Sequence, residues 1–332
     1  MLTIKVPPQN RRLACLIVLI AILLIFPVQL MAADRLACAS YPVWIFARFL
    51  TQGTDRFQAE LITNPATGCP HEFAPAARDL ERLTKTRFLV KNGLDLESYL
   101  PQALMVAPKD IKVIDASDAV PTLSQVWGRV DLEGEPAKRS GGKLPSMLPN
   151  PHIFLSPKNA KIMVANIADA LIELDPQNQE HYRERLAQWS SDMDRLSDAI
   201  ADFQNTRRGY KVMTSHGFFD YLAQDLGLTV LADLSPSEEA PPSAARLDLL
   251  RKIITSEKIN AILLDPHADP SAAQTLGAEL KVPGAVIDTV ASGPSDPPLD
   301  YYQLVLKEDL ELLSSLFPPN YKAPDQTDSG GQ

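Results

Sequence analysis

The sequence predicts an α/β protein of two lobes, each with a parallel-rich sheet covered by helices, joined by one long rigid connector helix. The chain has 332 residues, which is long for one ordinary domain and sufficient for two lobes that each bury a core. Short apolar runs alternate with amphipathic stretches along most of the chain. This alternation is typical of parallel sheets with helices on both faces.

Eight short apolar runs are predicted to be strands, and helical stretches fall between most of them. The predicted strands are Leu36–Ser40, Ala59–Thr63, Arg87–Lys91, Lys112–Asp115, Lys211–Thr214, Leu228–Ala232, Asn260–Leu264 and Gly284–Thr289.

Two helices are marked by their first residues. Ser156-Pro157 and Asp175-Pro176 each place an N-cap residue before a proline at the first helical position. In the second helix, apolar side chains recur at four- and three-residue steps from Tyr182 to Phe203. A helix over about 176–205 would be roughly 45 Å long at 1.5 Å per residue. We expect it to pack along both lobes, and a long helix within one lobe is the alternative.

The predicted organisation has five parts. They are a signal peptide over 1–33, an N-terminal lobe over 34–175, the connector over 176–206, a C-terminal lobe over 207–317 and a disordered tail over 318–332.

The N-terminus has the pattern of a secretory signal. Three basic residues precede an apolar run, Leu13–Phe26, which is shorter than the roughly 20 residues of a spanning helix. Small residues follow at Ala32 and Ala33, where we expect cleavage and release into the periplasm. An uncleaved signal anchor is the alternative. Lipidation of Cys38 is not predicted, because Arg35 stands where a lipoprotein would need leucine.

Cleavage would leave an acidic protein with two cysteines. Removing three of 32 basic residues and no acidic ones leaves 29 against 41, a net charge of −12. This charge disfavours nucleic acid and anionic membranes as partners. Cys38 and Cys69 are predicted to form a disulfide in an oxidising compartment. A thiolate metal site is the alternative, because Cys69 lies two residues before His71.

Three of the five histidines and one aspartate are predicted to lie near strand ends, where open α/β sheets bind ligands. His71 follows the second strand through a turn, and His216 directly follows the fifth. His152 stands between a Pro- and Gly-rich loop over 136–149 and the helix at Pro157, and Asp288 ends the last strand. Their separations of 81, 64 and 72 residues match no local metal motif. Spacing alone therefore predicts no more than a secreted two-lobed α/β protein.

Six segments carry a more specific pattern. They are Cys69-Pro70-His71-Glu72-Phe73 with Asp79, Leu89–Leu94 with Glu97, Asn150-Pro151-His152 running on to Ser156-Pro157, Ser215-His216-Gly217-Phe218 running on to Tyr221, Pro236–Ser243 with Glu239, and Val286-Ile287-Asp288. In this order they resemble the motifs of the metal-binding solute-binding proteins of bacterial ABC transporters, in the zinc/manganese group (cluster A-I). The resemblance covers roughly residues 35–317. Asn150 replaces the aspartate common in that family, and Phe154 replaces the usual tryptophan.

The resemblance implies one metal ion bound by His71, His152, His216 and Asp288. Three neutral imidazoles and one carboxylate suit a borderline ion such as Zn²⁺. Mn²⁺ prefers more oxygen ligands, and related manganese carriers often replace one histidine with a carboxylate, so zinc is favoured over Mn²⁺. The candidates for orienting the imidazoles are Glu72, Asp220 and Glu239. His267 is a possible accessory ligand, and His181 is interpreted as a surface residue.

The resemblance also implies a function without catalysis. We expect a monomer that captures one ion between its lobes and delivers it to an ABC transporter membrane permease. The alternatives are a manganese carrier of the same family, a secreted zinc hydrolase, and a cell-surface adhesin of the same fold. A catalytic zinc keeps one position open for water, which a fourth ligand at Asp288 would close. An adhesin would need an anchor, and none is predicted.

Overall fold

The structure, a computed structural model, describes residues 33–68, 70–123, 148–235 and 242–320. Residues from Asp34 onward form one structural unit, and the account below concerns that unit. The predicted signal peptide, most of the 136–149 loop and nearly all of the C-terminal tail lie outside the described residues. Within the described ranges, no helix combines the length and the apolar character needed to cross a membrane.

The first half of the chain forms a four-stranded parallel sheet in the order β2-β1-β3-β4. Its strands are β1 (Asp34–Cys38), β2 (Phe57–Leu61), β3 (Phe88–Lys91) and β4 (Lys112–Asp115). Successive side chains of a strand point to opposite faces. Leu36 and Cys38 accordingly face the core shared with α2 (Tyr41–Thr51) and α5 (Pro157–Leu174), whereas Ala37 faces a separate cluster. That cluster lies under α3 (Ala77–Thr84) and α4 (Leu100–Ala103).

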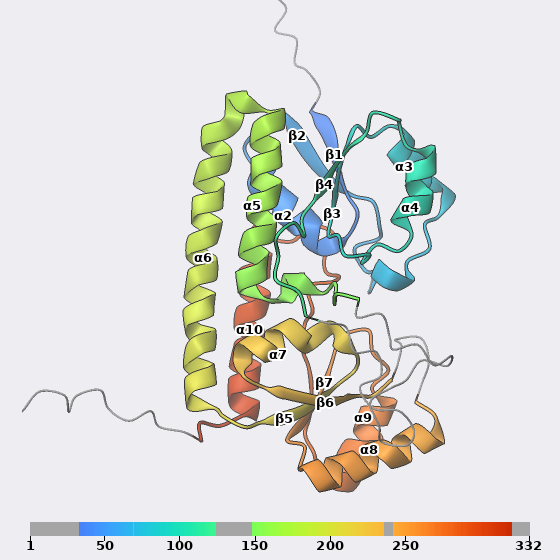
Figure 1. Cartoon of the computed structure of the whole chain (residues 1–332), viewed down its shortest axis with the longest axis vertical. Coiled ribbons are helices and arrows are strands. Elements are labelled where there is room, and N and C mark those ends of the chain that lie inside the picture. The colour runs from blue at the N-terminus through green and yellow to red at the C-terminus, as the bar shows by residue number, and fades with distance from the viewer. Residues whose placement is uncertain (1–32, 69, 124–147, 236–241, 321–332) are drawn as a thin grey trace, which may run out of the picture. The chain divides into compact units, whose positions relative to one another are not determined.

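The second half forms another parallel sheet, in the order β6-β5-β7-β8. Its strands are β5 (Lys211–Thr214), β6 (Thr229–Asp233), β7 (Ala261–Leu264) and β8 (Gly284–Val286). One face packs against α8 (Ala244–Glu257) and α9 (Ser271–Leu280), and the other against α7 (Asp220–Leu226) and the main core (Figure 1).

All eight predicted strands are confirmed, and the last is shorter than predicted. β8 ends at Val286, and Ile287 makes one further backbone hydrogen bond to Leu264. Asp288 therefore lies in the loop after β8 and not in the strand.

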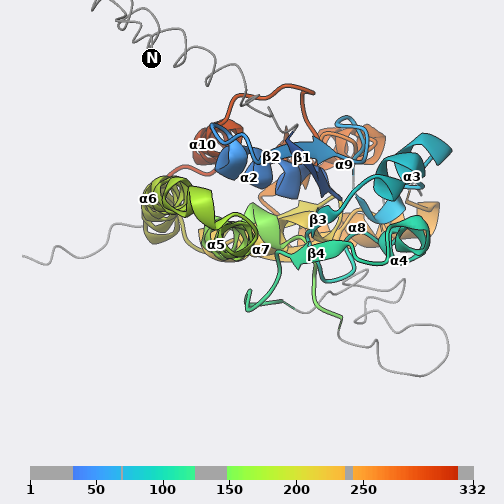
Figure 2. The same ribbon diagram turned by 90° about the horizontal axis from the view of Figure 1, so that it is seen from above.

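The predicted connector is confirmed as the longest described helix, α6 (Gln179–Thr206), which contacts α2 and α5 of the first half and α7 and α10 (Tyr301–Leu316) of the second. Its first turn differs from the prediction, because Pro176–Asn178 form a 3₁₀ turn. Asp175 does not cap this turn; its carboxylate accepts hydrogen bonds from Asn178 and Tyr182. Figure 2 shows α5 and α6 running side by side.

Aromatic packing fixes the connector to its neighbours. Trp189 of α6 is fully buried, and its ring lies 5.1 Å from Phe46 and from Phe49 of α2 and 5.3 Å from Tyr302 of α10. These contacts join helices from both ends of the sequence in one core.

The predicted disulfide has no support from the structure. Cys38 is a buried free thiol whose Sγ donates to the carbonyl of Leu36 at 3.6 Å. Burial raises the pKa of this thiol well above its usual range. Cys69 lies outside the described residues, so the pairing stays a prediction.

Candidate metal centre

Three histidines from distant parts of the sequence lie side by side. His71 is in a 3₁₀ turn over Pro70–Glu72, and His152 directly precedes another over Ile153–Leu155. His216 follows β5 and precedes a third, Gly217–Phe219. The ring centroids of His71 and His152 are 5.2 Å apart, and those of His152 and His216 are 5.7 Å apart. The structure thus brings together the three predicted imidazole ligands.

These separations suit a shared metal ion. Two imidazoles on one tetrahedral zinc have ring centroids roughly 5 Å apart, given Zn–N bonds of about 2.0–2.1 Å. Even so, the described residues contain no group of three His, Cys, Asp or Glu side chains that is already arranged to hold an ion.

Aromatic side chains surround the central imidazole. Phe218 lies with its ring centroid 4.1 Å from that of His152 and 4.2 Å from that of His216. Phe154 follows His152 by two positions in the sequence, and the centroids of the two rings are 6.2 Å apart. Both phenylalanines are fully buried, as is His152. The histidines therefore occupy a poorly hydrated environment, in which bonds to a cation are strengthened.

Burial keeps the imidazoles of His71 and His152 neutral. Desolvation, with a smaller contribution from the neighbouring His216, lowers the pKa of His71 to about 4. Desolvation also lowers the pKa of His152 well below its usual range, with contributions from His71 and His216. A neutral imidazole is the form that binds a metal ion.

Asn150 connects His152 to the second half of the chain. Its Oδ1 accepts from the backbone N–H of His152 at 3.0 Å and lies 2.8 Å from His152 Nδ1. Its Nδ2 donates to the Gly217 carbonyl at 2.8 Å and to Asp220 Oδ2 at 3.1 Å. Asp220, one of the three residues predicted to orient the imidazoles, is therefore linked to His152 by hydrogen bonds through Asn150.

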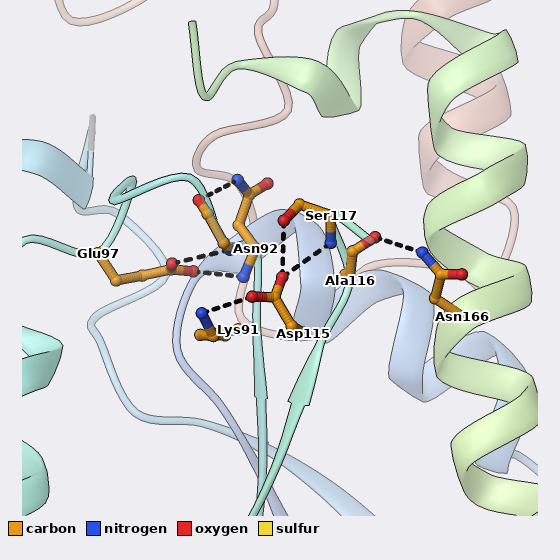
Figure 3. Close-up of polar contacts among 8 residues, drawn as sticks. Lys91, Asn92, Glu97, Asp115, Ala116, Ser117 and Asn166 are labelled. Carbon is orange, nitrogen blue, oxygen red and sulfur yellow. Dashed lines mark hydrogen bonds and ion pairs between the residues drawn. The ribbon is translucent and has the colours of Figure 1, made fainter. Parts of the chain in front are cut away.

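The turn after β3 supports the same loop. Asn92 is fully buried, and its Nδ2 donates to the carbonyls of Gly93 and Pro151 at 3.0 Å each. The buried carboxylate of Glu97 accepts from the backbone N–H groups of Asn92 and Gly93, as Figure 3 shows. Burial raises the pKa of Glu97, and these hydrogen bonds oppose the rise. The Asn-Gly-Glu motif thus has a structural role, since it fixes the residue before His152.

Gly93 is required by its surroundings. Its φ is +91°, in the left-handed region that favours glycine. A Cβ at this position would overlap Asp115 and Ser117, whose side chains hydrogen-bond to each other in the turn after β4 (Figure 3). Asn166 of α5 donates to the Ala116 carbonyl and holds this second turn.

Asp288, the predicted fourth ligand, is held by a different set of residues. It is half-buried, and its carboxylate accepts from the backbone of Val290 at 2.8 Å and from the Tyr301 hydroxyl at 3.4 Å. Burial raises its pKa. Among the described residues, none of its hydrogen bonds is to His71, His152 or His216.

Asp265 is a carboxylate that the sequence interpretation missed. It directly follows β7, is buried, and places Oδ2 3.7 Å from His216 Nδ1. The Ser215 hydroxyl donates to the same Oδ2 at 2.6 Å. Its position directly after a predicted strand could have identified it, but only His267 of the Asp265-Pro266-His267 segment was considered as a ligand.

The remaining candidates are less informative. Neither the Glu72 side chain nor Glu239 is among the parts of the chain that the structure describes. His267 is exposed and its Nε2 lies 2.6 Å from the Ser292 hydroxyl. His181 is partly buried and lies 3.2 Å from the Leu50 carbonyl, so it is not the plain surface residue of the prediction.

Two parallel sheets joined by one long helix, with imidazoles from both halves in contact, define a two-lobed binding protein. Residues 37–315 match the family of the zinc-uptake complex component A, periplasmic (ZnuA), and the chain belongs to this family. The match spans the strands of both sheets.

Individual relatives agree with this assignment. The chain is 28% identical over 253 residues to the zinc-binding lipoprotein AdcA of Streptococcus pneumoniae, covering 76% of this chain and 49% of that protein. It thus spans about half the length of that relative. It is 25% identical over 288 residues to the high-affinity zinc uptake system protein ZnuA of Bacillus subtilis, covering 82% and 84%. The solved structure of FpvC from Pseudomonas aeruginosa in complex with Mn²⁺ has a TM-score of 0.71 at 21% identity, covering 86% and 98%, and shows the shared fold.

Proposed function

We propose that the chain is an exported carrier that captures one transition-metal ion, with zinc favoured, and delivers it to an ABC uptake permease. The observation that carries this proposal is the juxtaposition of His71, His152 and His216. These imidazoles come from three segments far apart in the sequence, and their centroids are 5.2 and 5.7 Å apart in sequential pairs.

Zinc is favoured by the donor set. Three imidazoles with one carboxylate match the nitrogen-rich tetrahedral sites of zinc, whereas Mn²⁺ prefers a larger share of oxygen ligands. The names of the AdcA and ZnuA relatives refer to zinc. Manganese is the second candidate, because the solved FpvC structure contains it.

Carriage is favoured over hydrolysis by the surroundings of the imidazoles. A catalytic zinc needs an open position for water and a residue that moves a proton. His152 and Phe218 are buried against each other, and two carboxylates, Asp265 and Asp288, are available near strand ends for a fourth ligand. A closed site suits an ion that is held and then released.

Export and the permease complete the proposal. The basic start and the 14-residue apolar run support a signal peptide cleaved near Ala32 or Ala33, and release into the periplasm. The permease would take the ion by favouring a conformation of lower metal affinity.

A zinc titration of the mature, zinc-free protein tests the proposal. We expect about one ion per chain by isothermal titration calorimetry with a competing chelator. His71→Ala, His152→Ala and His216→Ala should each weaken binding by more than the roughly 10–100-fold cost of losing a group that only orients a ligand.

A histidine outside the cluster supplies a matched control. His181→Ala removes an imidazole that lies 3.2 Å from the Leu50 carbonyl, and this variant should bind zinc like the unchanged protein. Normal zinc binding by all three cluster variants would overturn the proposed site.

A further inference from the structure

We propose that Asn150 is the positioning residue of the metal centre: it fixes His152 in the tautomer with its proton on Nδ1 and leaves Nε2 as the nitrogen that binds the ion. This inference rests on the proposed function only in naming His152 a metal ligand. The tautomer itself is a property of the metal-free protein.

The orientation of the Asn150 amide follows from the fixed donor and acceptor roles of its partners. Its Nδ2 faces two acceptors, the Gly217 carbonyl at 2.8 Å and Asp220 Oδ2 at 3.1 Å. Its Oδ1 faces the backbone N–H of His152, which can only donate, at 3.0 Å. A flipped amide would set an oxygen against two acceptors and an NH₂ against a donor.

The tautomer of His152 follows from this orientation. Its Nδ1 lies 2.8 Å from Asn150 Oδ1, an oxygen that can only accept. A hydrogen bond at this distance requires the proton to be on Nδ1. In the neutral ring Nε2 is then the unprotonated nitrogen, as in metal sites where a partner at one ring nitrogen fixes the other as the ligand.

Asn150 is itself held at its backbone. Its N–H donates to the Leu123 carbonyl at 2.7 Å, and its carbonyl accepts from the Tyr221 hydroxyl at 2.6 Å. The same hydroxyl accepts from the Leu123 N–H at 2.9 Å. Tyr221 belongs to α7, and Gly217 directly follows His216. The orientation of His152 is therefore set by the same segment that carries His216.

An amide serves here better than a carboxylate. The position must accept from His152 and also donate to Gly217 and Asp220, and only an amide does both. A carboxylate at residue 150 would face Asp220 Oδ2 at 3.1 Å without a proton between them.

Nuclear magnetic resonance of the zinc-free protein with ¹⁵N-labelled histidine tests the inference directly. Long-range ¹H–¹⁵N spectra distinguish a protonated Nδ1 from a protonated Nε2. We expect the Nδ1–H form for His152 in the unchanged protein. Asn150→Asp keeps an acceptor beside Nδ1 and should retain this form, whereas Asn150→Leu removes the acceptor and should lose it.

Asn320→Leu is the matched control, because it also removes an amide that accepts from a backbone N–H and donates to a backbone carbonyl, both of Arg208. It should leave the His152 tautomer and the zinc affinity unchanged, whereas Asn150→Leu should weaken zinc binding by roughly 10–100-fold.

Two results would overturn the inference: an Nε2–H form of His152 in the unchanged protein, or an Nδ1–H form that persists in Asn150→Leu. The first needs no variant, so it decides the matter even where Asn150→Leu fails to fold. Absence of zinc binding by the unchanged protein would instead refute the proposed function, while the spectra would still decide the role of Asn150.

Discussion

At the scale of single residues, two carboxylates are candidates for the fourth ligand position of the ion. Asp265 Oδ2 lies 3.7 Å from His216 Nδ1, and the Ser215 hydroxyl already donates to it at 2.6 Å. Asp288 lies in the loop after β8, where the Val290 N–H donates to Oδ1 at 2.8 Å and the Tyr301 hydroxyl donates to Oδ2 over a longer 3.4 Å. A carboxylate beside an imidazole orients that ring, whereas an oxygen held by one long hydrogen bond can bind an ion.

We therefore predict different effects of removing the two charges. Asp288→Asn should weaken zinc binding severely, because it removes a ligand, and Asp265→Asn should weaken it by roughly 10–100-fold, as for a group that orients a ligand. Competition titration with a chromophoric chelator measures both affinities. The reverse order of effects would make Asp265 the ligand and Asp288 a structural residue.

The sequence could predict some of these residues and not others. The three histidines were predicted because each lies in a segment that resembles a motif of the family. The contacts of Asn150 with Gly217 and of Asp265 with His216 were not, because they join residues 67 and 49 positions apart that no local pattern connects. Only the fold brings these partners into contact.

At the scale of elements, α10 supports the loop that carries Asp288. Asp309 of this helix is buried, and its Oδ1 accepts from the backbone N–H of Asp288 at 3.1 Å. Burial, with smaller contributions from the nearby Asp288 and Glu308 charges, raises the pKa of Asp309 to about 8. Between its ordinary pKa of about 4 and this value, the unfolded carboxyl is ionised while the folded one keeps its proton. The protein therefore loses stability as the pH rises through this window.

Asp309→Asn should remove this pH dependence. Its free energy of unfolding, relative to that of the unchanged protein, should rise between pH 5 and 8 by up to ~1.4 kcal/mol per pH unit. Urea unfolding of the zinc-free proteins at pH 5.5 and 7.5 measures the difference. Glu311→Gln, on the exposed side of the same helix, should follow the unchanged protein. Parallel pH dependence of all three proteins would show that Asp309 is ionised in the folded state.

Element types were more predictable than element ends. Period and composition identified the eight described strands and the connector, because most of these elements bury apolar side chains at regular spacing. The end of β8 was not predictable, since Ile287 continues the apolar pattern into a loop and is fully buried there. The 3₁₀ turn before α6 was not predictable either. The Asp175 carboxylate accepts hydrogen bonds from Tyr182 and Asn178, so it is not available as a helix cap.

At the scale of the whole described unit, the two sheets share one core. The main hydrophobic cluster includes Leu36 of β1, Trp189 of α6 and Leu263 of β7, so apolar contacts continue from the first sheet to the second. Separating the lobes widely would expose this surface to water, at a cost of roughly 25 cal/mol per Å² of apolar area. We therefore expect the ion to enter and leave through movement of loops and side chains around the histidines.

The predicted boundaries at 34–175, 176–206 and 207–317 stay predictions, because the two sheets share one core. The alternation of strands and helices predicted two sheets, but it contains no information on how far the sheets share side chains. α2, α5, α6, α7 and α10 contribute to the same cluster, so no cut through the chain leaves two separate cores.

The central claim is that the exported chain holds one zinc ion through its three clustered histidines. The most direct test is the metal content of the protein purified from its exporting compartment without added metal, measured by mass spectrometry of the elements. We predict about one zinc per chain in the unchanged protein and little zinc in His152→Ala. An unchanged protein without zinc, or equal zinc in the two proteins, would contradict the account.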